Sequence, residues 1–248
     1  MSDRDRPDRP TFRVVADQIR AAIRSGTYAP GSTLPPDVRL AEDFGTNRNI
    51  VGKAIVLLTA EGFVSKAPNQ RGATVTRIVA KFRRDSEGSF NAAIQALGMA
   101  PESRVRVSRA APPATVADIL GVPAGSESAV VHALHVYADA TPVLLVDSYI
   151  PVTVAQAAGL ETEDTGAGGM LPRLAEAGYR QTSVEEIINV RTPSPDEAEK
   201  LDLTEDHRVF ELVNITRTED GAAVLVALHT MPVHLWELSY RRAADPQR

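Results

Sequence analysis

A strip of polar and basic residues at positions 47–53 has the side-chain types that read nucleic-acid bases. It comprises Asn47, Arg48, Asn49 and Lys53, with Gly52 between the last two. Arginine pairs with guanine through two hydrogen bonds, and asparagine pairs with adenine in the same way. Each pair contributes about 1–3 kcal/mol of discrimination between bases. Carried on the exposed front of a helix, such a strip suits entry into a DNA major groove.

The strip belongs to a predicted pair of short helices over residues 37–62. Apolar residues repeat there at intervals of three and four, as in amphipathic helices. Gly45 supplies the turn, Asn47 stands where the N-cap of the second helix is wanted, and Gly62 ends that helix. On this stretch alone, an ordinary helix pair with a solvated polar face remains an open alternative.

Two further elements flank the helix pair. The segment from Thr11 to Ser25 predicts a first helix with Thr11 as its cap, and two short alternating segments at 63–65 and 73–76 predict a hairpin, or wing. Residues near the hairpin tip are suited to reach a minor groove or phosphates. The candidate DNA contacts are therefore Arg39, Thr46, Asn47, Arg48, Asn49 and Lys53 in the helices, and Gln70, Arg71 and Gly72 in the wing.

The charge of the chain is unevenly distributed. Residues 1–84 carry 15 Lys and Arg against 8 Asp and Glu, a net charge of +7, whereas the remainder carries −12. A polyanion would therefore bind to the N-terminal third and not to the rest of the chain.

The histidines and serines do not form a recognisable catalytic or metal site. His132 and His135 are three apart on a predicted strand, so they point to opposite faces and cannot hold one metal together. Ser148 beside Asp147 is not a nucleophile arrangement, and the chain has no nucleophile elbow, phosphate-binding glycine loop or zinc-protease motif. We predict that the protein is not an enzyme and needs no metal or cofactor.

The composition indicates in which part of the cell the protein acts. The chain has no cysteine, which excludes disulfides and zinc–thiolate sites, and no apolar stretch of membrane-spanning length. The first ten residues, MSDRDRPDRP, are charged and rich in proline and do not resemble a signal peptide. We expect a disordered arm over residues 1–10 and a cytoplasmic protein that has no contact with membranes.

From residue 91 onward the pattern mixes helices and strands, and hairpins dominate. Long alternating segments at 129–137 and 142–150 flank a short turn, and segments at 208–218 and 222–231 flank an Asp220-Gly221 step, a strong hairpin signal. The further segments predict helices at about 90–97, 115–122, 169–177 and 195–203, and strands at 104–110, 183–191 and 235–240. This order predicts an α+β fold with a largely antiparallel sheet.

The N-terminal part resembles the GntR family of bacterial transcription regulators. The resemblance rests on VADQIRAAIRSGTYAPGSTLP, RLAEDFGTNRNIVGKAIVLLTAEGFV and QRGATV, and it covers residues 12–76. It implies a winged helix-turn-helix. Two family contacts are absent, because Val38 stands where the family has a DNA-contacting arginine and Gly52 replaces a second basic residue. Arg48 is retained, so the departures bear on the operator sequence and not on the DNA-binding fold.

The C-terminal part resembles the UTRA domain, the effector-binding half of the HutC subfamily of GntR regulators, whose fold is similar to chorismate lyase. The matching segments over about residues 88–242 are DILGVPAGS, YADATPVLLVDSYIP, DEAEKLDL, TEDGAAVLV and LWELSY. Relatives that bind sugar phosphates have arginines on the strand before the ADG-like turn and a glutamate just before SYIP. Here that strand, VVHALHVYADA, contains His132 and His135 but no arginine, and Val146 stands where the glutamate would be. We therefore expect an apolar or weakly polar effector. The candidate effector residues are Ser89, Phe90, His132, Leu134, Val136, Val146 and Ser148.

Together these features predict a sequence-specific DNA-binding transcription regulator. The resemblance implies a repressor that binds a DNA operator as a homodimer and responds to a small-molecule effector. The expected organisation is an arm (1–10), a winged helix-turn-helix domain (11–77), a linker (78–88) and an effector-binding and dimerisation domain (89–243). The alternative is a winged-helix interaction module with weak or no specific DNA binding, for which Val38 and Gly52 are the best support.

Overall fold

The computed structural model describes residues 10–65, 72–76, 82–85, 90–166, 168–204 and 207–240. Contacts divide the chain into two compact units. The first comprises Met1–Ala93 with two returning segments, Leu203–Arg208 and Val233–Arg248, and the second comprises Ile94–Asp202 and Val209–Pro232. Each unit is described in turn.

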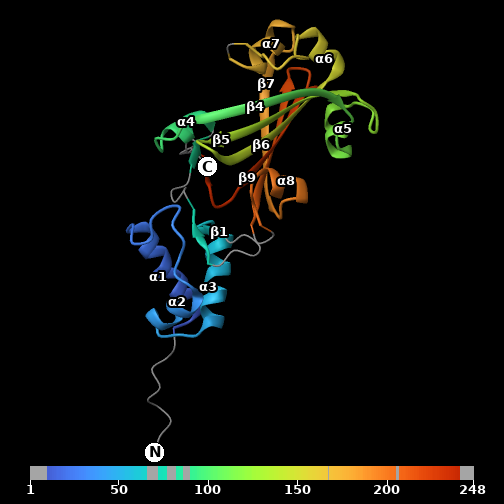
Figure 1. Ribbon diagram of the computed structural model, residues 1–248. Coiled ribbons are helices and arrows are strands. Elements are labelled where there is room, and N and C mark those ends of the chain that lie inside the picture. The colour runs from blue at the N-terminus through green and yellow to red at the C-terminus, as the bar shows by residue number, and fades with distance from the viewer. Residues whose placement is uncertain are drawn as a thin grey trace, which may run out of the picture. The chain divides into compact units, whose positions relative to one another are not determined.

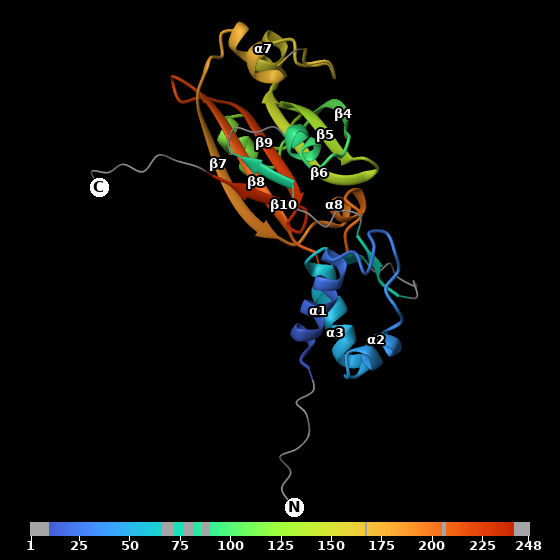
Figure 2. The ribbon, with the colours of Figure 1, turned by 90° about the vertical axis from the view of Figure 1, so that its left-hand side faces the viewer.

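Three helices and a short hairpin form the winged part of the first unit (Figure 2). Their bounds are α1 (Phe12–Arg24), α2 (Asp37–Asp43), α3 (Arg48–Ala60), β1 (Val64–Ser65) and β2 (Thr74–Val75). Both predicted N-caps are confirmed, because the Thr11 and Asn47 side chains accept the backbone N–H groups of Val14 and Ile50. Gly45 and Gly62 have positive φ values of 60° and 75°, which supports the predicted turn and helix end.

The apolar faces of these elements meet in one core. Ile19 of α1, Leu40 of α2 and Leu58 of α3 are fully buried, and Leu34 of the preceding turn is 2% exposed. Arg20 fixes α1 to the end of α3, since its Nε donates to Glu61 Oε2 over 3.0 Å. The core therefore holds α3 with its opposite side free for solvent.

A strand inside the predicted linker is the main departure from expectation. Residues Phe82–Asp85 form β3, which pairs in parallel with β10 (Trp236–Ser239). The rings of Phe82 and Trp236, both fully buried, lie 5.1 Å apart, and Phe90 meets Trp236 edge-on at 5.4 Å. Burial of these aromatic rings gives part of the predicted linker a fixed structure. The helix α4 (Phe90–Gln95) follows, close to the predicted 90–97.

The second unit is built on a six-stranded sheet in the order β4-β5-β6-β9-β8-β7 (Figure 2). Every neighbouring pair is antiparallel, so the predicted α+β fold with a largely antiparallel sheet is confirmed. The strands are β4 (Pro101–Ala110), β5 (Ala129–Ala138), β6 (Thr141–Pro151), β7 (Gln181–Arg191), β8 (Val209–Thr218) and β9 (Ala223–Pro232).

Helices cover both faces of this sheet. The helix α5 (Ala114–Leu120) packs on the face that carries Ile215 and Val226. On the other face, which carries Val130 and Ile150, lie α6 (Val152–Ala157) and α7 (Met170–Glu176). The helix α8 (Pro195–Lys200) lies at the end of the sheet away from α6 and α7 (Figure 1). Sequence patterns missed α6 because its VTV start continues the apolar, β-branched character of β6.

Candidate functional sites

The front of α3 carries the predicted DNA contacts on an exposed surface. Arg48, Asn49 and Lys53 are exposed, whereas Val51 and Ala54 on the opposite side are buried. Arg48 is the first residue of α3 and makes no ion pair with any residue that the structure describes. Its guanidinium is therefore available for an external partner.

Two other predicted DNA contacts, Arg39 and Asn47, already have partners within the protein. Arg39 Nε lies 3.1 Å from Asp43 Oδ1 and Asn47 caps α3, while the Thr46 hydroxyl is buried without a hydrogen-bond partner in the described part of the chain. Gly72 lies two residues before β2 with a φ of 92°, and a Cβ there would meet Thr33 Cγ2 at 2.9 Å. The remaining predicted contacts, Gln70 and Arg71, lie outside the described residues.

Gly52 has no packing reason to be glycine. A Cβ at this position would meet nothing within 4 Å, and its backbone conformation is helical. We expect Gly52→Ala to raise the free energy of unfolding by about 0.5–1 kcal/mol, since alanine loses less backbone entropy in a helix. Urea unfolding of the full chain checks this. The matched control is Gly62→Ala, which must destabilise because a Cβ there lies 1.9 Å from the His234 ring; an unstable Gly52→Ala protein contradicts the prediction.

Five of the predicted effector residues share one face of the sheet. His132 pairs with Ser148 in one cross-strand row, Leu134 pairs with Val146 in the next, and Val136 follows on the same face. His132, Val136, Val146 and Ser148 are buried, and His132 Nε2 lies 2.7 Å from the carbonyl oxygen of Leu160. His135 lies on the opposite face, as its spacing from His132 predicted. Phe90 packs on Trp236, and Ser89 lies outside the described residues.

Asn214 is a polar residue on that face that sequence reasoning missed. Asn214 follows His132 and Ser148 in the same cross-strand row, through Ala227. Its Oδ1 is buried without a hydrogen-bond partner in the described part of the chain. Burying a carbonyl oxygen without a hydrogen-bond partner costs free energy, so this group is a candidate to accept a hydrogen bond from a bound molecule. Its sequence signal is a single amide in the otherwise apolar segment LVNIT.

The opposite face carries charged groups around a cavity of about 370 Å³ next to α8. At its edge Arg191 donates to both carboxylate oxygens of Glu197 over 2.6 Å and to Glu211 over 2.7 Å. Burial alone would raise the pKa of Glu197, but hydrogen bonds from Arg191, the Ser194 N–H and Thr230 hold that pKa at about 2. These groups fix α8 to the ends of β7, β8 and β9.

Comparisons with known proteins agree with the two-part structure. The profile of the gntR family of bacterial regulatory proteins matches residues 11–75, and that of the UTRA domain matches residues 96–234. The chain belongs to the GntR family of regulators that carry a UTRA domain. It is therefore a transcriptional regulator and not an enzyme.

Individual relatives extend this finding. An uncharacterized HTH-type transcriptional regulator of Streptomyces coelicolor is 31% identical over 95% of this chain and 94% of its own length. Another, from Rhizobium meliloti, is 41% identical over 27% of each chain. The crystal structure of PhnF from Mycobacterium smegmatis shares the fold, with a TM-score of 0.57 and 21% identity over 95% of this chain and 100% of that one.

None of the helices in the described segments is long and apolar enough to cross a membrane. Within those same segments, no three His, Asp or Glu side chains cluster in a way that suits a metal ion.

Proposed function

We propose that this GntR–UTRA regulator is a repressor that binds a specific operator and that a small molecule in its C-terminal domain modulates operator affinity. The observation that carries the proposal is the exposed front of α3, a helix held by a buried core, where Arg48 makes no ion pair with any described residue. In a helix-turn-helix, the N-terminal residues of the recognition helix contact base edges. The protein acts in the cytoplasm, where its operator lies.

The residues of α3 have distinct roles in this proposal. Arg48 pairs with a guanine, Asn49 reads an adenine, and Lys53 contacts a phosphate. Arg39 contacts phosphate from α2, since its exposed ion pair with Asp43 contributes little and is readily exchanged. Gly52 leaves space on the helix surface for the DNA backbone to approach.

The regulator acts as a homodimer in this proposal. Two recognition helices about one helical turn of DNA apart read the half-sites of an inverted repeat. The effector changes operator affinity because it binds one arrangement of the two winged domains better than the other.

A mobility-shift assay on the promoter region of the protein's own gene tests this function, at two salt concentrations and with competitor DNA. We expect salt-sensitive binding that survives excess competitor. Binding that competitor removes, or no binding at all, overturns specific recognition and favours a winged-helix interaction module.

For the effector site we propose the buried sheet face that carries His132, Ser148 and Asn214. This row and the next one contain neither arginine nor lysine, and both are formed wholly by described residues. The unsatisfied Asn214 Oδ1 offers an acceptor to a ligand donor. The effector is therefore small and weakly polar.

This effector proposal predicts that sugar phosphates do not stabilise the protein. Because these two rows contain no arginine or lysine, a phosphate held there loses more hydration than it regains in contacts. The measurement is the melting temperature with and without glucosamine 6-phosphate, with inorganic phosphate as the control for ionic strength. A rise with the sugar phosphate that phosphate alone does not give contradicts the proposal.

A further inference from the structure

The cavity beside α8 lies on the face of the sheet opposite to the proposed effector residues. Strand residues alternate between faces, so Ala133 and His135 face this cavity while His132 and Leu134 have their Cβ atoms on the other side. The cavity volume of about 370 Å³ falls at the lower end of the range for small-molecule sites. It lies wholly within the second unit, and Leu134 is the one proposed effector residue among those that line it.

One cross-strand row forms the floor of the cavity. Arg106 of β4 pairs with Ala133 of β5, which pairs with Asp147 of β6. Adjacent strands lie about 4.8 Å apart, so the backbones of Arg106 and Asp147 are roughly 10 Å apart with only a methyl group between them. Ala133 thus leaves space between two opposite charges on the same face.

The other charged groups around the cavity are paired within the protein. Arg191 binds Glu197 and Glu211, Lys200 Nζ lies 2.7 Å from Asp196 Oδ2, and Arg104 Nε lies 2.8 Å from Glu102 Oε1. Burial and the charge of Arg104 lower the pKa of His135, so that side chain is neutral near pH 7.

Asp147 and Arg106 are the exceptions. Neither makes an ion pair or a side-chain hydrogen bond with another residue in the described part of the chain. Desolvation raises the pKa of Asp147, against the opposing charge of Lys200, as expected of a carboxylate without a direct partner. The Asp147 carboxylate on β6 and the Arg106 guanidinium on β4 therefore each lack a direct partner of opposite charge among the described residues.

We propose that this cavity binds a small zwitterion, with its amino group on Asp147, its carboxylate on Arg106 and its carbon chain over Ala133. A guanidinium is the side chain best matched to a carboxylate, because it donates two parallel hydrogen bonds. A ligand with a single charge satisfies only one of the two groups. Binding here is a property of the second unit and does not depend on DNA binding or on the effector proposed for the opposite face.

Isothermal titration calorimetry of the full chain tests the proposal with 4-aminobutanoate, 5-aminopentanoate and 6-aminohexanoate. These probes vary the distance between the two charges, and pentanoate and pentylamine are the controls with one charge each. We expect saturable binding of at least one amino acid of the series, about tenfold or more tighter than that of either control. Equal binding of a control, or no binding of any probe at millimolar concentration, overturns the proposal.

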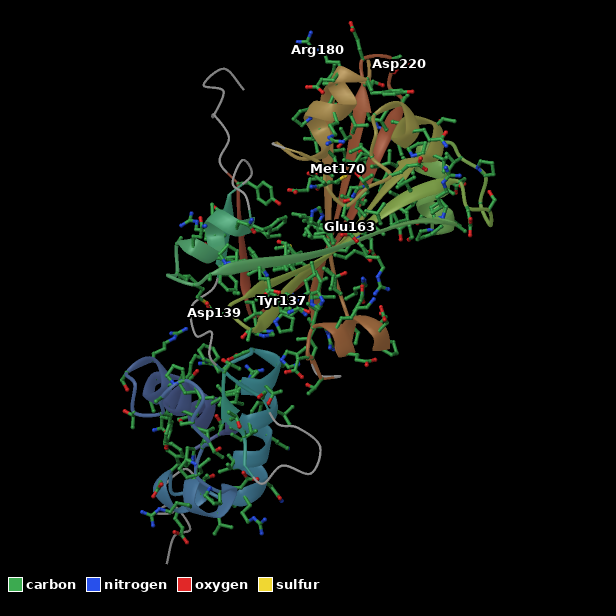
Figure 3. The ribbon with its side chains drawn as sticks, turned by 45° about the horizontal axis from the view of Figure 1, so that its top comes forward. Tyr137, Asp139, Glu163, Met170, Arg180 and Asp220 are labelled. Atoms are coloured by element: carbon green, nitrogen blue, oxygen red, sulfur yellow. The ribbon has the colours of Figure 1, made fainter. Side chains whose placement is uncertain are left out.

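Variants assign the binding to this cavity. We expect Asp147→Asn and Arg106→Gln each to weaken binding about tenfold or more, and Ala133→Leu to abolish it by filling the floor. Asp147 and Arg106 are exposed, so their variants remain folded even if Ala133→Leu does not. The matched controls are Glu185→Gln on β7 and Arg180→Gln. Figure 3 shows Arg180 at the end of the sheet away from α8. Unchanged binding by Asp147→Asn or Arg106→Gln shows that the probe binds elsewhere and refutes this site.

Discussion

Arg48→Ala is expected to lose about five- to 150-fold in discrimination between operator and nonspecific DNA for each half-site, which corresponds to about 1–3 kcal/mol. The free energy of unfolding should stay unchanged, because Arg48 is exposed and pairs with no other described side chain. The cap of α3 also survives, since Asn47 supplies it. Competition mobility-shift assays measure the loss, and urea unfolding checks stability.

Arg48→Lys separates base reading from a phosphate contact. Lysine keeps the charge but not the two parallel donors of arginine, so discrimination should fall while nonspecific binding stays close to that of the unchanged protein. Arg48→Ala also removes one positive charge. Arg180→Gln, in the C-terminal domain, removes one positive charge away from α3 and is the control for that loss. Uniform weakening on all DNA sequences in Arg48→Ala, with unaltered discrimination, would assign Arg48 to a phosphate and contradict base reading.

The elements that could be predicted from the sequence depend on contacts between near neighbours in the chain. An N-cap joins residues three apart, as Asn47 and Ile50 are, and the Asp220-Gly221 hairpin joins adjacent strands. The three helices predicted from such local patterns in the N-terminal part, over residues 11–25 and 37–62, were confirmed. The pairing of β3 with β10 joins residues about 150 positions apart, and nothing in the segment FRRD indicates its partner.

The same distinction applies to the candidate sites. Alternation along one strand correctly placed His132 and His135 on opposite faces. Across strands, the sequence gives no register. It therefore could not show that Asn214 shares a row with Ser148, or that Ala133 separates Arg106 from Asp147. Both features depend on the register between strands, because a shift of one residue would move each of these side chains to the other face of the sheet.

The acid sensitivity of the second unit should depend on Glu197. Its pKa of about 2 in the folded chain lies below the ordinary value of 4.5. A carboxylate with a depressed pKa adds stability that is fully present above pH 4.5 and is lost as the pH falls toward 2. The side chain of Glu197 is 17% exposed, so solvent screens its pairing with Arg191 only in part.

We therefore expect Glu197→Gln to lower the free energy of unfolding by roughly 1–3 kcal/mol at neutral pH and by much less near pH 2. The variant leaves Arg191 with Glu211 as its remaining carboxylate partner among the described residues. Urea unfolding followed by circular dichroism over this pH range measures the difference. Asp196→Asn is the matched control on the same helix: its carboxylate is 71% exposed and pairs only with Lys200 in the described chain, so about 0.5 kcal/mol or less should be lost. If the loss in free energy of unfolding of Glu197→Gln stays the same as the pH falls, packing and not the charge of Glu197 holds α8 to the sheet, which contradicts the prediction.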